Sequence, residues 1–178
     1  MKKSELTLRC GILTVSDRSA QGERPDSSGP ALQAALTQQG WLVEKRLTVP
    51  DEPHLIREVL LDWAESEQVD VILTTGGTGF SPRDITPEAT LSIVERQAPG
   101  IAEAMRAASL RITPHAMLSR AVAGIHRKTL IINLPGSPKA AVENLETILP
   151  VLPHAVQLIH NDPSSEAGHQ LKPGASLK

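Results

Sequence analysis

Residues Val69–Thr75 read VDVILTT and are followed at once by the glycine pair Gly76-Gly77. A short, continuous apolar run that stops at glycine is typical of a strand buried on both faces, as in parallel sheets. Two similar runs precede it, LRCGILTVS at Leu8–Ser16 and the segment Trp41–Val49. Because helical patterns lie between these runs, the chain predicts a three-layer α/β/α domain with a mostly parallel sheet.

Helical patterns occupy most of the segments between the strands. Ser28 is placed to cap a helix that runs to about Gln39, whereas the polar stretch from Asp17 to Ser28 predicts a loop. The other helices are predicted to begin near Pro53, Pro87, Pro99 and Pro135-Gly136, with a break or kink in the last one at Pro150 and Pro153. Two further strands are predicted to pair around a turn at residues 126–128, namely Ala121–Ile125 and Thr129–Asn133.

The composition narrows the possible functions. The 178 residues include 18 Lys and Arg against 20 Asp and Glu, so the net charge of −2 gives no general attraction to nucleic acid or membranes. Only Phe80, Trp41 and Trp63 are aromatic, which is too few for a base-stacking surface. The single cysteine, Cys10, excludes an intrachain disulfide and a multi-cysteine zinc site.

The length favours one domain over residues 1–160, and the Pro-, Ser- and Gly-rich residues 161–178 predict a flexible tail. No apolar run approaches the ~18 residues of a membrane span, and the first residues lack a signal-peptide pattern. We therefore expect a cytoplasmic protein with no membrane or nucleic-acid partner. The six histidines show no HExxH spacing and no GxSxG motif occurs, so a zinc protease or serine hydrolase is not predicted.

The clearest chemical signal follows the Val69–Thr75 strand, where Thr74–Thr90 reads TTGGTGFSPRDITPEAT. Ligands of such sheets bind at the carboxyl ends of the strands, and a glycine-rich turn there can present its N–H groups to an anion. The motif is neither a P-loop nor GxGxxG, and a tight turn without a ligand is the alternative. The adjoining Ser81-Pro-Arg-Asp84 adds an acid and a base on a proline-stiffened loop.

Two carboxylates follow predicted strands, Asp51 after the second and Asp84 after the third. If they face one crevice beside a phosphate, they form a plausible Mg²⁺ site, because Mg²⁺ prefers oxygen ligands and commonly bridges carboxylate and phosphate. The alternative for Asp51 is a helix N-cap.

A further segment, Asn133–Ala140, reads NLPGSPKA and lies at a predicted helix start, where free N–H groups favour an anion. Ser137 as an ordinary N-cap before Pro138 is the alternative. The polar residues Ser16 and Asp17, and the loop to Gly29, are weaker candidates.

Taken together, these segments resemble the molybdopterin adenylyltransferase family, the MogA/MoaB group that also includes the gephyrin G domain. The matching elements are long and irregular, stand in family order and span roughly residues 8 to 160. They are GILTVSD at Gly11–Asp17, PDSSGP at Pro25–Pro30, VPDE at Val49–Glu52, TTGGTGFSPRDITPEAT at Thr74–Thr90, MLSRAVAGI at Met117–Ile125 and LIINLPGSPKA at Leu130–Ala140.

The resemblance implies a MogA-like fold with a mixed sheet, assembly as a homotrimer, and Mg²⁺-dependent transfer of AMP from ATP to molybdopterin. It implies that Asp51 and Asp84 are the catalytic, metal-binding residues, and that the product passes to a molybdate-inserting protein. It further implies a molybdopterin- and nucleotide-binding pocket comprising Ser16, Asp17, Thr75, Gly76, Gly77, Thr78, Gly79, Ser109, Asn133, Pro135, Gly136 and Ser137. A non-catalytic pterin- or partner-binding member and an unrelated nucleotide-binding regulatory domain are the alternatives.

Overall fold

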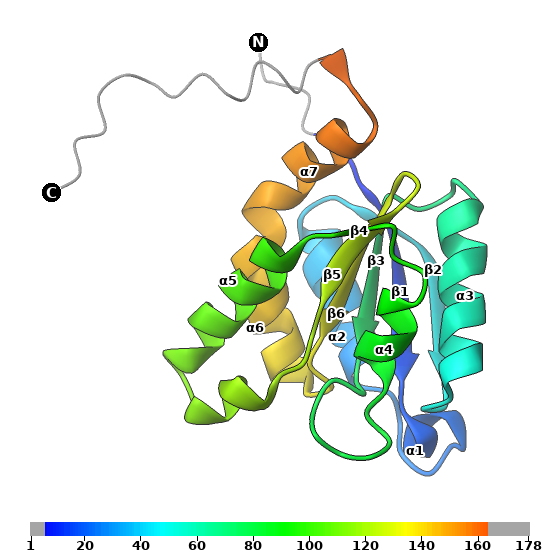
Figure 1. Cartoon of the computed structure of the whole chain (residues 1–178), viewed down its shortest axis with the longest axis vertical. Coiled ribbons are helices and arrows are strands. Elements are labelled where there is room, and N and C mark those ends of the chain that lie inside the picture. Colours follow the sequence, from blue (N-terminus) through cyan, green and yellow to red (C-terminus); the bar gives the residue numbers. More distant parts are fainter. Residues whose placement is uncertain (1–5, 164–178) are drawn as a thin grey trace, which may run out of the picture.

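The structure, a computed structural model, describes residues 6–163 (Figure 1). Its centre is a six-stranded sheet in the order β2-β1-β3-β6-β5-β4. The four strands from β2 to β6 are parallel, and the β5 and β4 strands extend the sheet in antiparallel pairings. The strands are β1 (Arg9–Val15), β2 (Leu42–Val49), β3 (Val71–Thr75), β4 (Arg96–Gln97), β5 (Ala123–His126) and β6 (Thr129–Leu134). The mixed, mostly parallel sheet is therefore confirmed.

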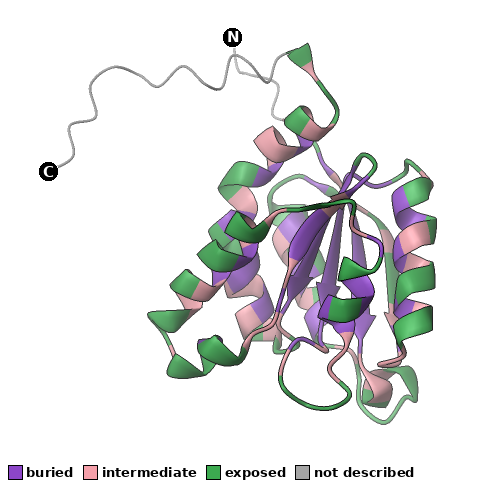
Figure 2. Cartoon of the chain, in the orientation of Figure 1, coloured by how far each residue is buried: buried purple, intermediate pink, exposed green. Residues whose placement is uncertain are grey.

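Helices cover both faces of the sheet, which gives the three predicted layers. Buried residues of α2, α5, α6 and α7 share one apolar cluster with β1, β3 and β6. Buried residues of α3 and α4 form a second cluster on the opposite face. Figure 2 shows the central strands as the most continuously buried part of the molecule. The helices are α1 (Asp17–Ala20), α2 (Ser28–Gln38), α3 (Pro53–Glu65), α4 (Thr86–Leu91), α5 (Pro99–Leu110), η1 (Pro114–Leu118), α6 (Pro138–Ile148), η2 (Leu149–Val151) and α7 (Leu152–Ile159).

Proline placement explains several helix boundaries. The α3, α5 and α6 helices each begin on a proline, whose fixed φ suits the first helical turn. The predicted break near Pro150 is present as the short η2 turn between α6 and α7. None of the helices in residues 6–163 has both the length and the apolarity that crossing a bilayer requires.

The structure also corrects the sequence reading. The segment after Ser16, predicted as a loop, contains the short α1 helix, and the Ser16 hydroxyl accepts a capping hydrogen bond from the N–H of Ser19 at 3.3 Å. The two-residue β4 strand and the η1 turn were not predicted, because neither has a periodic apolar pattern. The expected tail lies outside the described residues from residue 164 onward.

Candidate functional site

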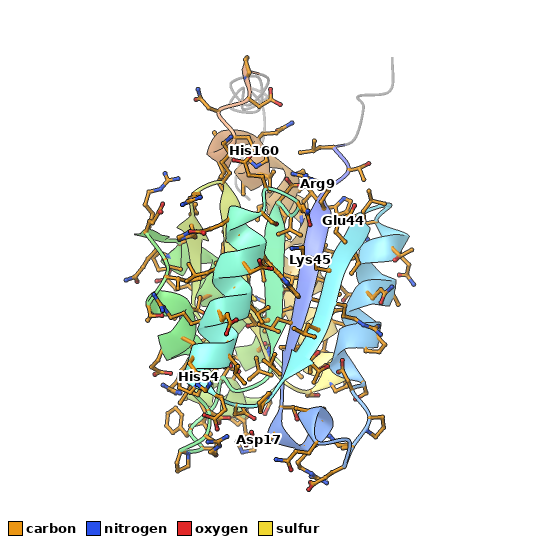
Figure 3. All side chains as sticks on the ribbon, turned by 90° about the vertical axis from the view of Figure 1, so that its right-hand side faces the viewer. Arg9, Asp17, Glu44, Lys45, His54 and His160 are labelled. Carbon is orange, nitrogen blue, oxygen red and sulfur yellow. The ribbon has the colours of Figure 1, made fainter. Side chains whose placement is uncertain are left out.

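The carboxyl ends of the four parallel strands meet at the lower end of the molecule in Figures 1 and 3, and Figure 3 labels Asp17 and His54 near this end. The segments that follow these strands line a cavity of about 530 Å³, which we call the carboxylate cavity. Of the residues predicted from the sequence, those that line it are Ser16, Asp51, Thr75, Gly76, Gly77, Asp84, Gly136 and Ser137.

The turn after β3 requires its two glycines. Gly76 has φ +101° and Gly77 has φ +62°, and a Cβ at position 76 would collide with the carbonyl oxygen of Val15. Gly76 donates its N–H to the carbonyl of Leu134 at 3.2 Å. Within residues 6–163, the N–H groups of Gly77 and Thr78 have no protein acceptor. Gly77 lines the carboxylate cavity, so its N–H is a free donor beside that cavity, as in an anion-binding backbone.

Asp51 is not the N-cap of α3, because Glu52 occupies that position and makes no side-chain capping bond. Instead, the Asp51 carboxylate accepts a hydrogen bond from the N–H of Asp17 at 2.8 Å, and the Asp17 carboxylate accepts one from the N–H of Asp51 at 2.9 Å. These reciprocal bonds join the loops that follow β1 and β2 and hold Asp51 at the cavity wall.

Burial raises the pKa of the Asp51 carboxyl, and the nearby charges of Asp17 and Asp84 also raise it, whereas the hydrogen bond from the Asp17 N–H and the charge of Arg83 lower it. The lining of the cavity includes more carboxylates than guanidinium groups, and a cation would offset that excess of negative charge.

Asp84 lines the same cavity from the loop that follows the glycine turn. Its carboxylate accepts a hydrogen bond from the N–H of Ser81 at 2.9 Å, within a tight turn that Asp84 closes by donating its own N–H to the Ser81 carbonyl at 2.9 Å. Among the described residues, no group of three or more His, Cys, Asp or Glu is arranged to hold a metal ion. Two carboxylates still fit Mg²⁺, which usually keeps several waters and takes one or two carboxylates together with phosphate oxygens.

Asp17, which the sequence predicts in the binding pocket, is not among the residues that line the carboxylate cavity. Both of its carboxylate oxygens accept hydrogen bonds from Arg83, at 2.9 and 3.0 Å. The hydrogen bonds from Arg83 hold the pKa of the Asp17 carboxyl below its usual value. Arg83 also pairs with Glu52 at 2.9 Å, so Asp17 and Glu52 anchor the loop that carries Asp84.

A second cavity, of about 280 Å³ and mainly apolar lining, adjoins the same loop, and we call it the apolar cavity. Thr78, Gly79, Ser109 and Pro135 line it, so Ser109, which is unremarkable by helical spacing, does reach a cavity. The Ser109 hydroxyl accepts a hydrogen bond from the Asn144 amide at 3.0 Å, across the contact between α5 and α6.

The structure places Asn133, which the sequence predicts to orient a ligand, away from both cavities. Asn133 is fully buried in β6 and lines neither cavity. Its amide N–H groups donate to the hydroxyls of Thr74 at 2.9 Å and Thr90 at 2.8 Å, and its carbonyl accepts from the N–H of Val122 at 3.3 Å. Because its hydrogen-bonding groups are engaged inside the protein, Asn133 ties β3, β6 and α4 together.

Two nearby hydroxyls have distinct roles. Ser137 occupies the N-cap position of α6, as the alternative predicted, yet its side chain makes no capping hydrogen bond and lines the carboxylate cavity. Thr75 lines that cavity too, and donates its hydroxyl to the Pro135 carbonyl at 2.7 Å.

The sequence places Asp26 only within a weaker candidate loop and does not single it out, yet it is a third carboxylate that lines the carboxylate cavity. Its oxygens accept hydrogen bonds from the hydroxyl of Thr14 at 2.9 Å and the N–H of Gly29 at 3.0 Å. An Asp three residues before a Gly at the start of a helical pattern is the signal that could have identified it. Asp26 thus fixes the start of α2 at the cavity rim.

The chain is similar to known proteins over most of its length. A domain family described as "probable molybdopterin binding domain" matches residues 11–154. The molybdopterin adenylyltransferase of Helicobacter pylori strain J99 is 44% identical, over 86% of this chain and 88% of that protein. Gephyrin of Dictyostelium discoideum is 47% identical, but the chain spans only 23% of its length. Among solved structures, the molybdopterin biosynthesis enzyme MoaB from Thermus thermophilus is 53% identical with a TM-score of 0.83, covering 88% of this chain and 99% of that one.

Proposed function

Because the chain belongs to the molybdopterin-binding domain family, we propose that it is a molybdopterin adenylyltransferase acting in molybdenum cofactor biosynthesis. It would transfer AMP from ATP to the terminal phosphate of molybdopterin and release pyrophosphate. The observation that carries the proposal is that Asp51, Asp84 and the Gly76-Gly77 turn line one cavity. A polyphosphate needs backbone donors for its oxygens and carboxylates for its counter-cation, and this cavity offers both.

The proposed AMP transfer depends little on general acid or general base catalysis. An oxygen of the molybdopterin phosphate attacks the α-phosphorus of ATP, while the bond from that phosphorus to the oxygen of the leaving pyrophosphate breaks. The attacking phosphate monoester is already an anion, so no strong general base is needed. Catalysis therefore depends on in-line positioning and on neutralising the charge of the transferred group.

The residues of the cavity suit these tasks. The free N–H group of Gly77 would bind a phosphate oxygen, and the Ser16 and Ser137 hydroxyls would orient the phosphate. Asp51 and Asp84 would hold Mg²⁺ directly or through its waters, and bound Mg²⁺ supplies positive charge to the phosphates. The adjoining apolar cavity would receive a heterocyclic ring of a reactant.

A homotrimeric assembly, a cytoplasmic location and hand-over of the product to a molybdate-inserting protein belong to the same proposal. They are carried by the family resemblance alone.

The test combines purified protein with molybdopterin and MgATP and measures pyrophosphate release. We expect release that requires both substrates and falls about 10²–10³-fold in Asp84→Asn, the scale seen when one well-placed polar group is removed from a charge-stabilising site. Asp62→Asn is the matched control, because the exposed Asp62 of α3 pairs with Lys45 of β2 and lines neither cavity. Binding of molybdopterin without pyrophosphate release would instead favour the non-catalytic member. Release that is indifferent to molybdopterin would favour a nucleotide-binding regulatory domain, and wild-type turnover in Asp84→Asn would refute the metal assignment.

A further inference from the structure

We propose that Arg120 is a positioning residue that fixes the Asp84 loop against the carboxylate cavity; this inference rests on the proposed function. Arg120 lies between η1 and β5, far from the loop in sequence. Its Nε donates to the carbonyl of Gly79 at 2.7 Å, and its Nη2 donates to the carbonyl of Asp84. Its own N–H donates to the carbonyl of Thr78 at 2.9 Å. One residue thus binds both ends of the segment from Gly79 to Asp84.

The shape of the guanidinium group matters for this role. Arginine presents its donors in a rigid plane, so a single side chain can hold two carbonyl oxygens at a fixed separation, whereas a lysine ammonium is a single point of charge. The remaining Nη1 forms an ion pair with Glu88 on α4. This exposed pair involves neither end of the loop.

The other contacts of the loop do not position it as those of Arg120 do. The hydrogen bonds between Ser81 and Asp84 are internal to the loop, so they shape it without placing it. Arg83 reaches outward to Asp17 and Glu52, but its side chain is 53% exposed, and exposed ion pairs are screened by solvent. Arg120 binds main-chain carbonyl oxygens, so it fixes the position of the backbone that carries the Asp84 carboxylate.

This position also links the two cavities. Thr78 and Gly79 line the apolar cavity, whereas Asp84 lines the carboxylate cavity. Because Arg120 binds the carbonyls of all three residues, it sets the placement of one cavity wall relative to the other. A small displacement of a reacting group is costly in rate, about 10²-fold for 1 Å.

The test compares Arg120→Lys and Arg120→Gln with the wild-type protein and with Glu88→Gln. Glu88→Gln is the matched control because it removes the ion pair and leaves both contacts to the loop carbonyls. We expect Arg120→Lys to lower kcat about 10- to 100-fold and to raise the Mg²⁺ concentration needed for half-maximal rate. The KM for ATP should change much less, since the glycine turn is untouched. Arg120→Gln should show the same pattern more strongly, and Glu88→Gln should resemble the wild type.

A second readout does not depend on turnover. In metal-free protein, amide hydrogen exchange of residues 79–84 should be faster in Arg120→Lys than in Glu88→Gln, while thermal unfolding confirms that both are folded. The proposal is overturned if Arg120→Lys keeps wild-type kcat and Mg²⁺ dependence, or if the exchange of the loop is unchanged. Failure of the wild-type protein to transfer AMP would instead refute the proposed function, and the exchange experiment would still report whether Arg120 holds the loop.

Discussion

Replacing Gly77 by alanine tests the geometry of the glycine turn most directly. At φ +62° a residue with a Cβ incurs about 1–2 kcal/mol of backbone strain. The new methyl group would also collide with the Thr86 hydroxyl and lie 3.0 Å from the Asp51 carboxylate. Thr86 is fully buried and donates to the Gly76 carbonyl at 2.9 Å. Displacing it leaves a buried polar group without its partner, which costs about a further 1–3 kcal/mol.

Gly40→Ala separates the two contributions. Gly40 has φ +74°, and nothing lies within 4 Å of the position its Cβ would take, so this variant incurs the backbone strain alone. We expect Gly77→Ala to unfold with a free energy about 2 kcal/mol lower than Gly40→Ala. For a domain of this size the difference corresponds to a melting temperature lower by roughly 4–8 °C. Urea denaturation and calorimetry measure both quantities. Equal stability of the two alanine variants would refute the claim that the methyl group meets Thr86 and Asp51.

Three further outcomes follow from the same site and core. Asp51→Asn should lose AMP transfer yet keep or gain stability at pH 7. Because the folded-state pKa of Asp51 is raised, a proton on Asp51 favours the folded state. This stabilisation is lost as the pH rises from 3.8 through the folded-state pKa. Urea denaturation across this pH range should therefore show a smaller decline in the free energy of unfolding for the variant than for the wild type. Asn133→Leu should lower the free energy of unfolding by about 2–4 kcal/mol, because it strands the hydroxyls of Thr74 and Thr90, while KM for both substrates is unchanged in folded protein. Burial raises the pKa of the Cys10 thiol to about 12, so a thiol reagent at pH 8 should label Cys10 only on unfolding, and rapid labelling of folded protein would contradict that burial.

The architecture was largely predictable because it depends on local patterns. The apolar runs that contain β1 and β3 and the prolines at helix starts are visible in short windows of sequence, and the observed bounds of those elements differ from the predicted ones by only a few residues. The meeting of Asp51 and Asp84 at one edge also follows from a general rule, since parallel strands bring the loops at their carboxyl ends together.

What the sequence could not reveal depends on side-chain partners distant along the chain. Nothing in the local pattern around Asn133 shows that its hydrogen bonds are satisfied by Thr74 and Thr90. Ser109 reads as an ordinary helical residue, and it reaches the apolar cavity only because α5 packs against α6. The exchange of hydrogen bonds between Asp17 and Asp51 likewise depends on the register of β1 against β2. Such pairings are decided by tertiary packing, which no short window contains.

The glycine turn fixes the spacing between the two cavities. Gly76 and Gly77 face the carboxylate cavity and the next two residues face the apolar cavity, with successive Cα atoms 3.8 Å apart. The distance between a group bound in the carboxylate cavity and one bound in the apolar cavity is therefore set by the covalent backbone, without a conformational change. A synthetic molecule that joins a polyphosphate to a flat apolar ring should bind about 10²–10⁴-fold more tightly than either half, provided that its linker matches this spacing. A joined molecule whose linker is too short to bridge the turn should bind no more tightly than the stronger-binding of its two parts.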